Sequence, residues 1–408
     1  MRYHDCKHER RHALALSVIS MAVAEPVGSQ LDVLLRRGVF QSLRYALDCD
    51  ALSAKLREQP ADLILCEITA TSCEGLLVSA RLARESSVGG LGQVPTILWV
   101  SELPLCALES YAAELRLKGA DIQIARSVEA IEESLSQNRE PQMPVENGES
   151  LARFSDEDLI RALGPKDGIR VVLQPQIDLS SGKLIGAEAL ARWHHPVAGH
   201  VPPLEFVDAL DRLSMEPLFF HMVTERVFEA QAVLCEYGGP LRMSVNVSAP
   251  VLAMPGVTRS LEERCHRHGI SPSLVTVEIT ENKTMDEKTL LEAGVHRLRS
   301  CGFGLSMDDF GTGASTLERL SRLPFNEIKI DRSFVQRIFH DSTSRAIVTV
   351  AIDLGRSLDM TVIAEGIETR DQARELMGLG CGVGQGFGLG RPMEVPDFIS
   401  TVRAFHAS

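Results

Sequence analysis

Short apolar, β-branched runs recur through residues 171–390, and stretches with helical spacing separate most of them. This alternation predicts repeated strand–helix units, which favour a parallel sheet. Such units are typical of a (β/α)8 barrel, whose chemistry lies at the carboxyl ends of its strands. The eight predicted strands are Val171–Leu179, Leu184–Trp193, Leu241–Ser248, Leu274–Thr280, Gly304–Phe310, Glu327–Asp331, Thr361–Gly366 and Gly384–Gly390.

The first two predicted strands are joined only by Ser180-Ser181-Gly182-Lys183. This connection is too short for a crossover helix, so the two strands should pair as an antiparallel hairpin. We therefore expect a modified barrel in which the first strand is antiparallel to its neighbours.

The amino-terminal half also alternates buried strand and helix patterns. These patterns predict a doubly wound α/β domain with five strands over residues 13–136. Prolines, asparagines and a glycine interrupt every periodic pattern in residues 137–150, which we interpret as a linker before a barrel domain at 151–408. The patterned segments are Ala15–Ala24, Gly28–Gly38, Ser42–Leu47, Ala61–Ile68, Pro95–Ser101 and Asp121–Ala125.

Composition agrees with two soluble domains. The chain has 408 residues, 44% of them hydrophobic, and a formal charge of −13, which argues against binding a nucleic-acid polymer. Nine cysteines without a Cys-x-x-Cys pair indicate reduced thiols and a cytoplasmic location. One alternative is secretion, because the apolar run Ala13–Ala24 follows basic residues, although it also fits a first buried strand. No later segment approaches the roughly 20 apolar residues of a membrane span.

Acidic or amide residues stand at the ends of most predicted barrel strands. Taken singly, each is a typical solvated loop residue or salt-bridge partner. If the strands share one rim, however, their oxygen atoms converge and suit Mg²⁺ or Mn²⁺ better than zinc. Two such cations would support hydrolysis of a phosphodiester. The residues are Glu188, Asn246, Glu278, Asp308, Asp309 and Glu365.

Ordered motifs recur through residues 151–408. They are Gln174-Pro175, Glu188-Ala189-Leu190-Ala191-Arg192-Trp193, Ser244-Val245-Asn246-Val247-Ser248, Glu278-Ile279-Thr280-Glu281, Asp308-Asp309-Phe310-Gly311-Thr312-Gly313, Lys329-Ile330-Asp331-Arg332-Ser333-Phe334-Val335, Ala364-Glu365-Gly366-Ile367-Glu368-Thr369 and Gly384-Gln385-Gly386. Together these blocks resemble the EAL-domain cyclic di-GMP phosphodiesterases. Many blocks at family-like intervals make the resemblance specific, whereas the tripeptide Glu-Ala-Leu alone would mean little.

The resemblance implies hydrolysis of cyclic di-GMP to linear pGpG with two Mg²⁺ or Mn²⁺ ions, in a homodimer or higher oligomer. By position, Glu188, Asn246, Glu278 and Asp308 match the ligands of one metal, and Asp308, Asp309 and Glu365 match those of the other. Lys329, Glu365 and Gln385 match catalytic positions, and the matching substrate contacts are Gln174, Arg192, Asp331 and Pro392. A non-hydrolysing receptor for the dinucleotide and a protein-interaction module are the alternatives.

Three features leave more than one interpretation. Lys329 would orient or deprotonate the attacking water, or neutralise charge in the transition state. Arg192 would hold a substrate phosphate or form a structural ion pair. His194 and His195 face opposite sides of a strand, so we interpret them as structural residues and not as a metal pair.

Residues from three separate stretches of the chain resemble the family's regulatory segment, a loop beside the dimer interface. It comprises Glu281, Phe310, Gly311, Thr312, Gly313 and Glu368. A simple turn is the alternative, because paired glycines commonly mark turns. The chain departs from the family pattern at Ala314 and Gly382, neither of which is a predicted ligand.

The amino-terminal half faintly resembles a response-regulator receiver through Ala61–Glu67 and Val23-Ala24-Glu25-Pro26. Glu67 occupies the place of the phosphoacceptor aspartate, and the apolar Val23-Ala24 pair cannot bind a hard cation. Arg126 takes the approximate place of the switch lysine. We therefore predict a pseudo-receiver without a phosphoacceptor, which dimerises or binds a regulatory protein partner.

Overall fold

A computed structural model of the chain describes residues 14–21, 40–69, 74–87, 95–126, 130, 153–164, 168–237, 239–279, 288–311 and 316–407. The chain divides into two compact units, Met1–Gly168 and Ile169–Ser408. The predicted linker, residues 137–150, lies outside the described residues, and so does the apolar pair Val23-Ala24. None of the described helices is both long enough and apolar enough to span a membrane.

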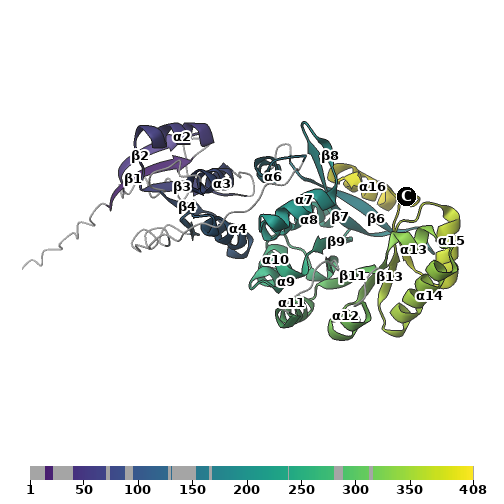
Figure 1. The fold of residues 1–408 in the computed structure, drawn as a ribbon. Coiled ribbons are helices and arrows are strands. Elements are labelled where there is room, and N and C mark those ends of the chain that lie inside the picture. The colour runs from purple at the N-terminus through teal and green to yellow at the C-terminus, as the bar shows by residue number, and fades with distance from the viewer. Residues whose placement is uncertain are drawn as a thin grey trace, which may run out of the picture. The chain divides into compact units, whose positions relative to one another are not determined.

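The first unit contains a five-stranded parallel sheet in the order β2-β1-β3-β4-β5 (Figure 1). This order is that of a doubly wound α/β fold, so the predicted receiver-like architecture is confirmed. Its elements are β1 (Leu14–Met21), β2 (Phe40–Ala46), α2 (Cys49–Glu58), β3 (Leu63–Glu67), α3 (Glu74–Ser87), β4 (Thr96–Val100), α4 (Leu105–Leu117), β5 (Ile122–Ala125) and α6 (Asp156–Ala162).

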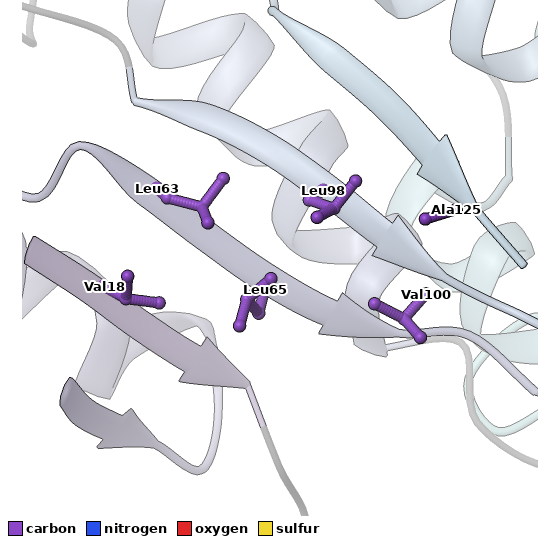
Figure 2. Packing of buried hydrophobic residues seen from close by; sticks show 6 residues of the cluster. All are labelled: Val18, Leu63, Leu65, Leu98, Val100 and Ala125. Atoms are coloured by element: carbon purple, nitrogen blue, oxygen red, sulfur yellow. The ribbon is translucent and has the colours of Figure 1, made fainter. Parts of the chain in front are cut away.

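Aliphatic side chains from four neighbouring strands form a core on one face of this sheet. Residues two apart on a strand share a face, and the pairs from β3 and β4 follow that rule. Figure 2 shows the cluster of Val18, Leu63, Leu65, Leu98, Val100 and Ala125. Strand β3 ends at Glu67, which is half-buried. That Glu67 does not accept a phosphoryl group stays a prediction.

The second unit contains the closed barrel. Strand β6 pairs antiparallel with both β7 and β14, and the other barrel neighbours pair in parallel, which confirms the predicted antiparallel first strand. The barrel order is β6-β7-β9-β10-β11-β12-β13-β14, and β8 and β15 extend it at two edges. The strands are β6 (Arg170–Asp178), β7 (Leu184–His195), β8 (Gly199–Val201), β9 (Arg242–Val247), β10 (Val275–Ile279), β11 (Gly304–Phe310), β12 (Glu327–Ile330), β13 (Thr361–Ala364), β14 (Val383–Gly384) and β15 (Met393–Glu394).

Helices surround the barrel strands, as Figure 1 shows. They cover the outer face of the strands, and this explains why strands such as β10 are buried along their whole length. The helices are α7 (Pro203–Arg212), α8 (Glu216–Glu236), α9 (Ala249–Ala253), α10 (Val257–Arg267), the short 3-10 helix η1 (Pro272–Leu274), α11 (Lys288–Ser300), α12 (Thr316–Arg322), α13 (Arg332–Gln336), α14 (Ser342–Ser357), α15 (Arg370–Leu379) and α16 (Val395–Ala407).

One predicted strand was too long. The sequence suggested Gly384–Gly390, but β14 contains only Val383–Gly384. The chain turns sharply at Gly386, where φ is +155° and an added Cβ would lie 2.2 Å from the backbone nitrogen of Ile367. Only glycine fits this close approach, and the turn places Gln385 at the end of the barrel strand.

Candidate active site

Four acidic side chains, three on separate barrel strands and one directly after β13, surround the ammonium group of Lys329 on β12. The Nζ atom lies 2.7 Å from Glu278 Oε2 and 2.7 Å from Glu365 Oε1. It lies 3.3 Å from Glu188 Oε1 and 3.3 Å from Asp308 Oδ1. The Lys329 side chain is only 1% exposed, so this charge cluster is screened from bulk water.

Strand register explains the convergence. Glu278 on β10 lies opposite Asn246 on β9, and Glu188 on β7 lies opposite Gln174 on β6. Paired residues of neighbouring strands point to the same face of a sheet, which inside a barrel is the interior. The barrel thus turns dispersed polar positions of the sequence into one site.

Amide side chains hold the Glu188 carboxylate from both sides. Asn246 Nδ2 donates to Glu188 Oε1 at 3.0 Å, and Gln385 Nε2 donates to Glu188 Oε2 at 2.5 Å. Gln385 Nε2 also donates to Gln174 Oε1 at 3.2 Å, while its Oε1 accepts from Gln176 Nε2 at 3.2 Å. Gln176 was missed by the sequence reasoning, although its position two residues after Gln174 on a strand puts both side chains on one face.

Backbone conformation fixes two turns that carry acidic residues of the site, one at Asp308-Asp309 and one after Glu365. Asp309 adopts φ +54°, and its amide donates to Asp308 Oδ1 at 3.0 Å. A non-glycine residue in this left-handed region costs on the order of 1 kcal/mol, and such strain gathers at functional sites. The turn after Glu365 uses Gly366 at φ +69°, where an added Cβ would lie 2.4 Å from Arg332 Cβ.

The site holds more negative charge than Lys329 balances. Burial, followed by the charge of Glu188, raises the pKa of Glu278 well above its ordinary value. Burial also raises the pKa of Glu365 to about 8, against the opposing effect of Lys329. Burial alone would lower the pKa of Lys329, but the surrounding carboxylates, led by Asp308, raise it well above the ordinary value. The excess charge favours additional cations.

The donor set suits hard divalent cations. It consists of carboxylate and amide oxygens, and Glu278 Oε1 is buried with no hydrogen-bond partner among the described protein atoms. In the described part of the chain, no three acidic, imidazole or thiol side chains are already grouped to hold a metal ion. The Lys329 ammonium, which contacts all four carboxylates, occupies the centre of their cluster.

Comparison with known proteins identifies the family. The EAL domain model matches residues 156–392, which is more than half of the chain. The chain belongs to the EAL domain family. The resemblance to that family and the barrel fold are confirmed, and the five-stranded parallel sheet of the first unit fits a receiver-like α/β domain.

Two curated relatives differ in the share of their own length that this chain covers. The oxygen sensor protein DosP of Escherichia coli is 39% identical over 57% of this chain, which spans only 30% of DosP. The cyclic di-GMP phosphodiesterase RocR of Pseudomonas aeruginosa is 28% identical over 83% of this chain and 86% of its own length. The RocR match covers 343 residues, which is longer than the second unit, so it extends into the first.

Two solved structures share the barrel. The phosphodiesterase PaMucR in complex with c-di-GMP has a TM-score of 0.53 and 35% identity, covering 56% of this chain and 94% of its own. Klebsiella pneumoniae BlrP1 in a manganese/cy-diGMP complex has a TM-score of 0.50 and 27% identity, covering 56% of this chain and 57% of its own. Both likenesses concern a little over half of this chain.

The four residues predicted to contact the substrate lie in different local environments. Gln174 belongs to the amide network of the site. Arg192 on β7 is partly buried, and burial lowers its pKa, against the nearby charge of Glu188. Asp331 accepts a hydrogen bond from the Ser333 amide at 2.9 Å and thereby caps α13. Pro392 is half-buried just before β15.

The predicted regulatory segment is described only in part, because Glu281, Thr312, Gly313 and the departure at Ala314 lie outside the described residues. Phe310 is buried. Gly311 has φ +96°, and a Cβ added there would lie 3.0 Å from Phe334 Cε2. Glu368 is exposed and accepts a hydrogen bond from Gln336. Gly382 is exposed with open space around it.

The adjacent histidines on β7 face opposite sides, as predicted. His194 is exposed, whereas His195 is buried and packs edge-on against Trp193. His195 Nδ1 accepts hydrogen bonds from the amides of Val197 and Ala198. This nitrogen is therefore engaged in shaping the β7–β8 turn.

Proposed function

We propose that the chain is a cyclic di-GMP phosphodiesterase that uses two Mg²⁺ or Mn²⁺ ions and releases linear pGpG. The observation that carries the proposal is the meeting of Glu188, Glu278, Asp308 and Glu365 within 3.3 Å of Lys329 Nζ. The same substrate class is supported by RocR, a cyclic di-GMP phosphodiesterase, and by the c-di-GMP complex of the PaMucR phosphodiesterase. The manganese complex of BlrP1 supports a divalent cation.

Divalent cations at this site would offset the charge of the phosphodiester and lower the pKa of the attacking water. Glu188, Asn246, Glu278 and Asp308 would hold one ion, and Asp308, Asp309 and Glu365 the other. Lys329 would stay in the site, its ammonium competing with the bound cations for the four carboxylates. There it would orient the water or neutralise the developing charge.

The remaining site residues orient the Glu188 carboxylate or bind a substrate phosphate. Gln385 and Asn246 fix the rotamer of Glu188 through their hydrogen bonds to its two oxygens. Fixed ligands lose little conformational entropy when a cation binds. Arg192 is suited to hold a non-reacting phosphate, because its planar fork matches phosphate oxygens.

Incubation of the full chain with cyclic di-GMP and Mn²⁺ tests the proposal. We expect chromatography to show linear pGpG, and we expect excess EDTA to stop its formation because the carboxylates alone cannot activate water. Excess Mn²⁺ added after EDTA should restore turnover. Tight binding of cyclic di-GMP without product would instead establish the receptor alternative, and neither binding nor product would refute both.

Proton release on metal binding is a second expected result. Glu365 has a pKa of about 8 in the metal-free fold, so near pH 7 it must lose a proton before it binds a cation. Mn²⁺ affinity should therefore rise as pH increases toward about 8, while the stability contributed by the bound proton is lost over the same window. Titration calorimetry at about pH 7 in two buffers of different ionisation enthalpy measures the release. Equal heats in both buffers would contradict this assignment.

Partners and location complete the proposal. It extends to homodimerisation and to control by the receiver-like unit, both of which the family resemblance implies. The cysteines of the described residues are all free, in keeping with the proposed cytoplasmic location.

A further inference from the structure

Three glutamine side chains form a chain of hydrogen bonds next to the carboxylate cluster. Gln174 and Gln176 lie two residues apart on β6, so both side chains lie on the same face of that strand. Gly384 on β14 pairs with Ile177 on β6, and this register brings the following residue, Gln385, beside them. All three glutamines are buried.

The hydrogen bonds of Gln385 are consistent with only one orientation of its amide. Its Oε1 accepts from Gln176 Nε2 at 3.2 Å. Its Nε2 donates to Glu188 Oε2 at 2.5 Å and to Gln174 Oε1 at 3.2 Å. An amide nitrogen carries two donors and the oxygen only accepts, so each group has a matching partner here. A flipped amide would turn its oxygen toward two acceptors and its nitrogen toward the donor of Gln176.

Of these three neighbours, only Gln176 can specify the orientation through a donor. An ionised Glu188 carboxylate only accepts hydrogen bonds. Gln174 donates its Nε2 to the carbonyl of Gly390 at 3.4 Å, so its oxygen is the atom that faces Gln385. The N–H group of Gln176 therefore decides which end of the Gln385 amide meets the carboxylate.

The backbone holds both ends of the contact between Gln176 and Gln385. The Gln385 amide donates to the carbonyl of Ala364 at 2.9 Å, and its carbonyl accepts from the Ile367 amide at 3.1 Å. Gln176 pairs with Gly186 on β7, where an added Cβ would lie 2.9 Å from Gln176 Oε1. Glycine at this position thus leaves the space that the Gln176 amide occupies.

We propose that Gln176 is a positioning residue that sets the amide orientation of Gln385 and, through it, the rotamer of Glu188. Gln385 holds Glu188 Oε2, which leaves Oε1 directed at Lys329 and at a cation bound there. Without the Gln176 donor the amide can flip, and its oxygen then repels the carboxylate. The effect on cation binding rests on the proposed function, whereas the orientation of Gln385 does not.

A double-mutant cycle tests whether Gln176 acts through Gln385. Gln176→Met removes the amide and keeps an unbranched side chain of similar size. Gln385→Met and the double variant complete the cycle, in which an effect transmitted through Gln385 is not additive. Gln231→Met is the matched control: this buried glutamine donates to the carbonyls of Leu241 at 3.0 Å and Leu274 at 2.8 Å, just before β9 and β10 and at the opposite end of the strands from the site.

The readout is the Mn²⁺ affinity of the full chain, measured by electron paramagnetic resonance without substrate. We expect Gln176→Met to bind Mn²⁺ about 10-fold more weakly than the wild type, because residues that orient metal ligands commonly contribute 10–100-fold. The double variant should bind Mn²⁺ no more weakly than Gln385→Met, and Gln231→Met should match the wild type. Wild-type affinity in Gln176→Met, losses that multiply in the double variant, or an equal loss in Gln231→Met would overturn the positioning role.

Neutron diffraction from crystals of the metal-free wild type tests the orientation without any variant. We expect deuterium on the Gln385 atom that faces Glu188 and on the Gln176 atom that faces Gln385. The reverse orientation of either amide would overturn the proposal. A wild type that binds no Mn²⁺ would refute the proposed function and with it the effect on cation binding, and the neutron map would still decide the orientation.

Discussion

Replacing Lys329 by methionine is expected to lower kcat for cyclic di-GMP by about 10³-fold, because a positioned charge at the reacting phosphate is lost. In metal-free protein the same change should also destabilise the barrel. The ammonium is the cation that contacts all four carboxylates, and removing one member of a buried charge cluster costs about 3–5 kcal/mol. The melting temperature of the barrel should therefore fall by on the order of 10 °C.

Mn²⁺ should reverse the stability loss but not the activity loss. Because no ammonium has to leave the cluster, Mn²⁺ should raise the melting temperature of Lys329→Met more than that of the wild type. Tryptophan fluorescence in a Trp99→Phe background reports on the barrel alone, since Trp193 is then the only tryptophan. Lys183→Met, in the exposed β6–β7 turn, is the control. Unchanged metal-free stability of Lys329→Met would show that the carboxylates do not depend on Lys329.

The barrel was predictable because its strands carry apolar runs whose ends are marked by polar residues. Gly304–Phe310 was predicted with the bounds observed, and the short connection predicted at Ser180-Ser181-Gly182-Lys183 correctly required antiparallel pairing. The final strand was not predictable in length, because its end depends on the backbone of Ile367 approaching Gly386. That contact joins residues brought together by the fold, and no local pattern records it.

The meeting of four acidic residues was predictable, but the arrangement of the site was not. Glu188, Glu278, Asp308 and Glu365 could be placed on one rim from their positions at strand ends, and the structure brings them together. The position of the Lys329 ammonium among them depends on side-chain rotamers and charge balance, which spacing does not specify.

Arg264→Met is expected to produce a similar loss of stability far from the strand-end site. Arg264 on α10 is 3% exposed and joins this helix to α8. Its Nη1 atom donates to the carbonyl of His221 at 2.9 Å and to Thr224 Oγ1 at 2.6 Å, and lies 3.5 Å from Glu225 Oε2. Its guanidinium also stacks over the Phe228 ring at 5.3 Å. Methionine keeps much of the volume but leaves Glu225 underpaired and the His221 carbonyl without this donor.

The expected cost is about 3–5 kcal/mol in the free energy of unfolding of the barrel, because the partners of a buried charge are left uncompensated. Denaturant unfolding followed by Trp193 fluorescence measures it. Arg259→Met is the matched control on the same helix: Arg259 is 80% exposed and pairs with Glu263 at 2.9 Å, so its loss should cost at most about 0.5 kcal/mol. Equal effects of the two variants would mean that burial does not distinguish the pairs, and that α8 and α10 are held together by apolar packing alone.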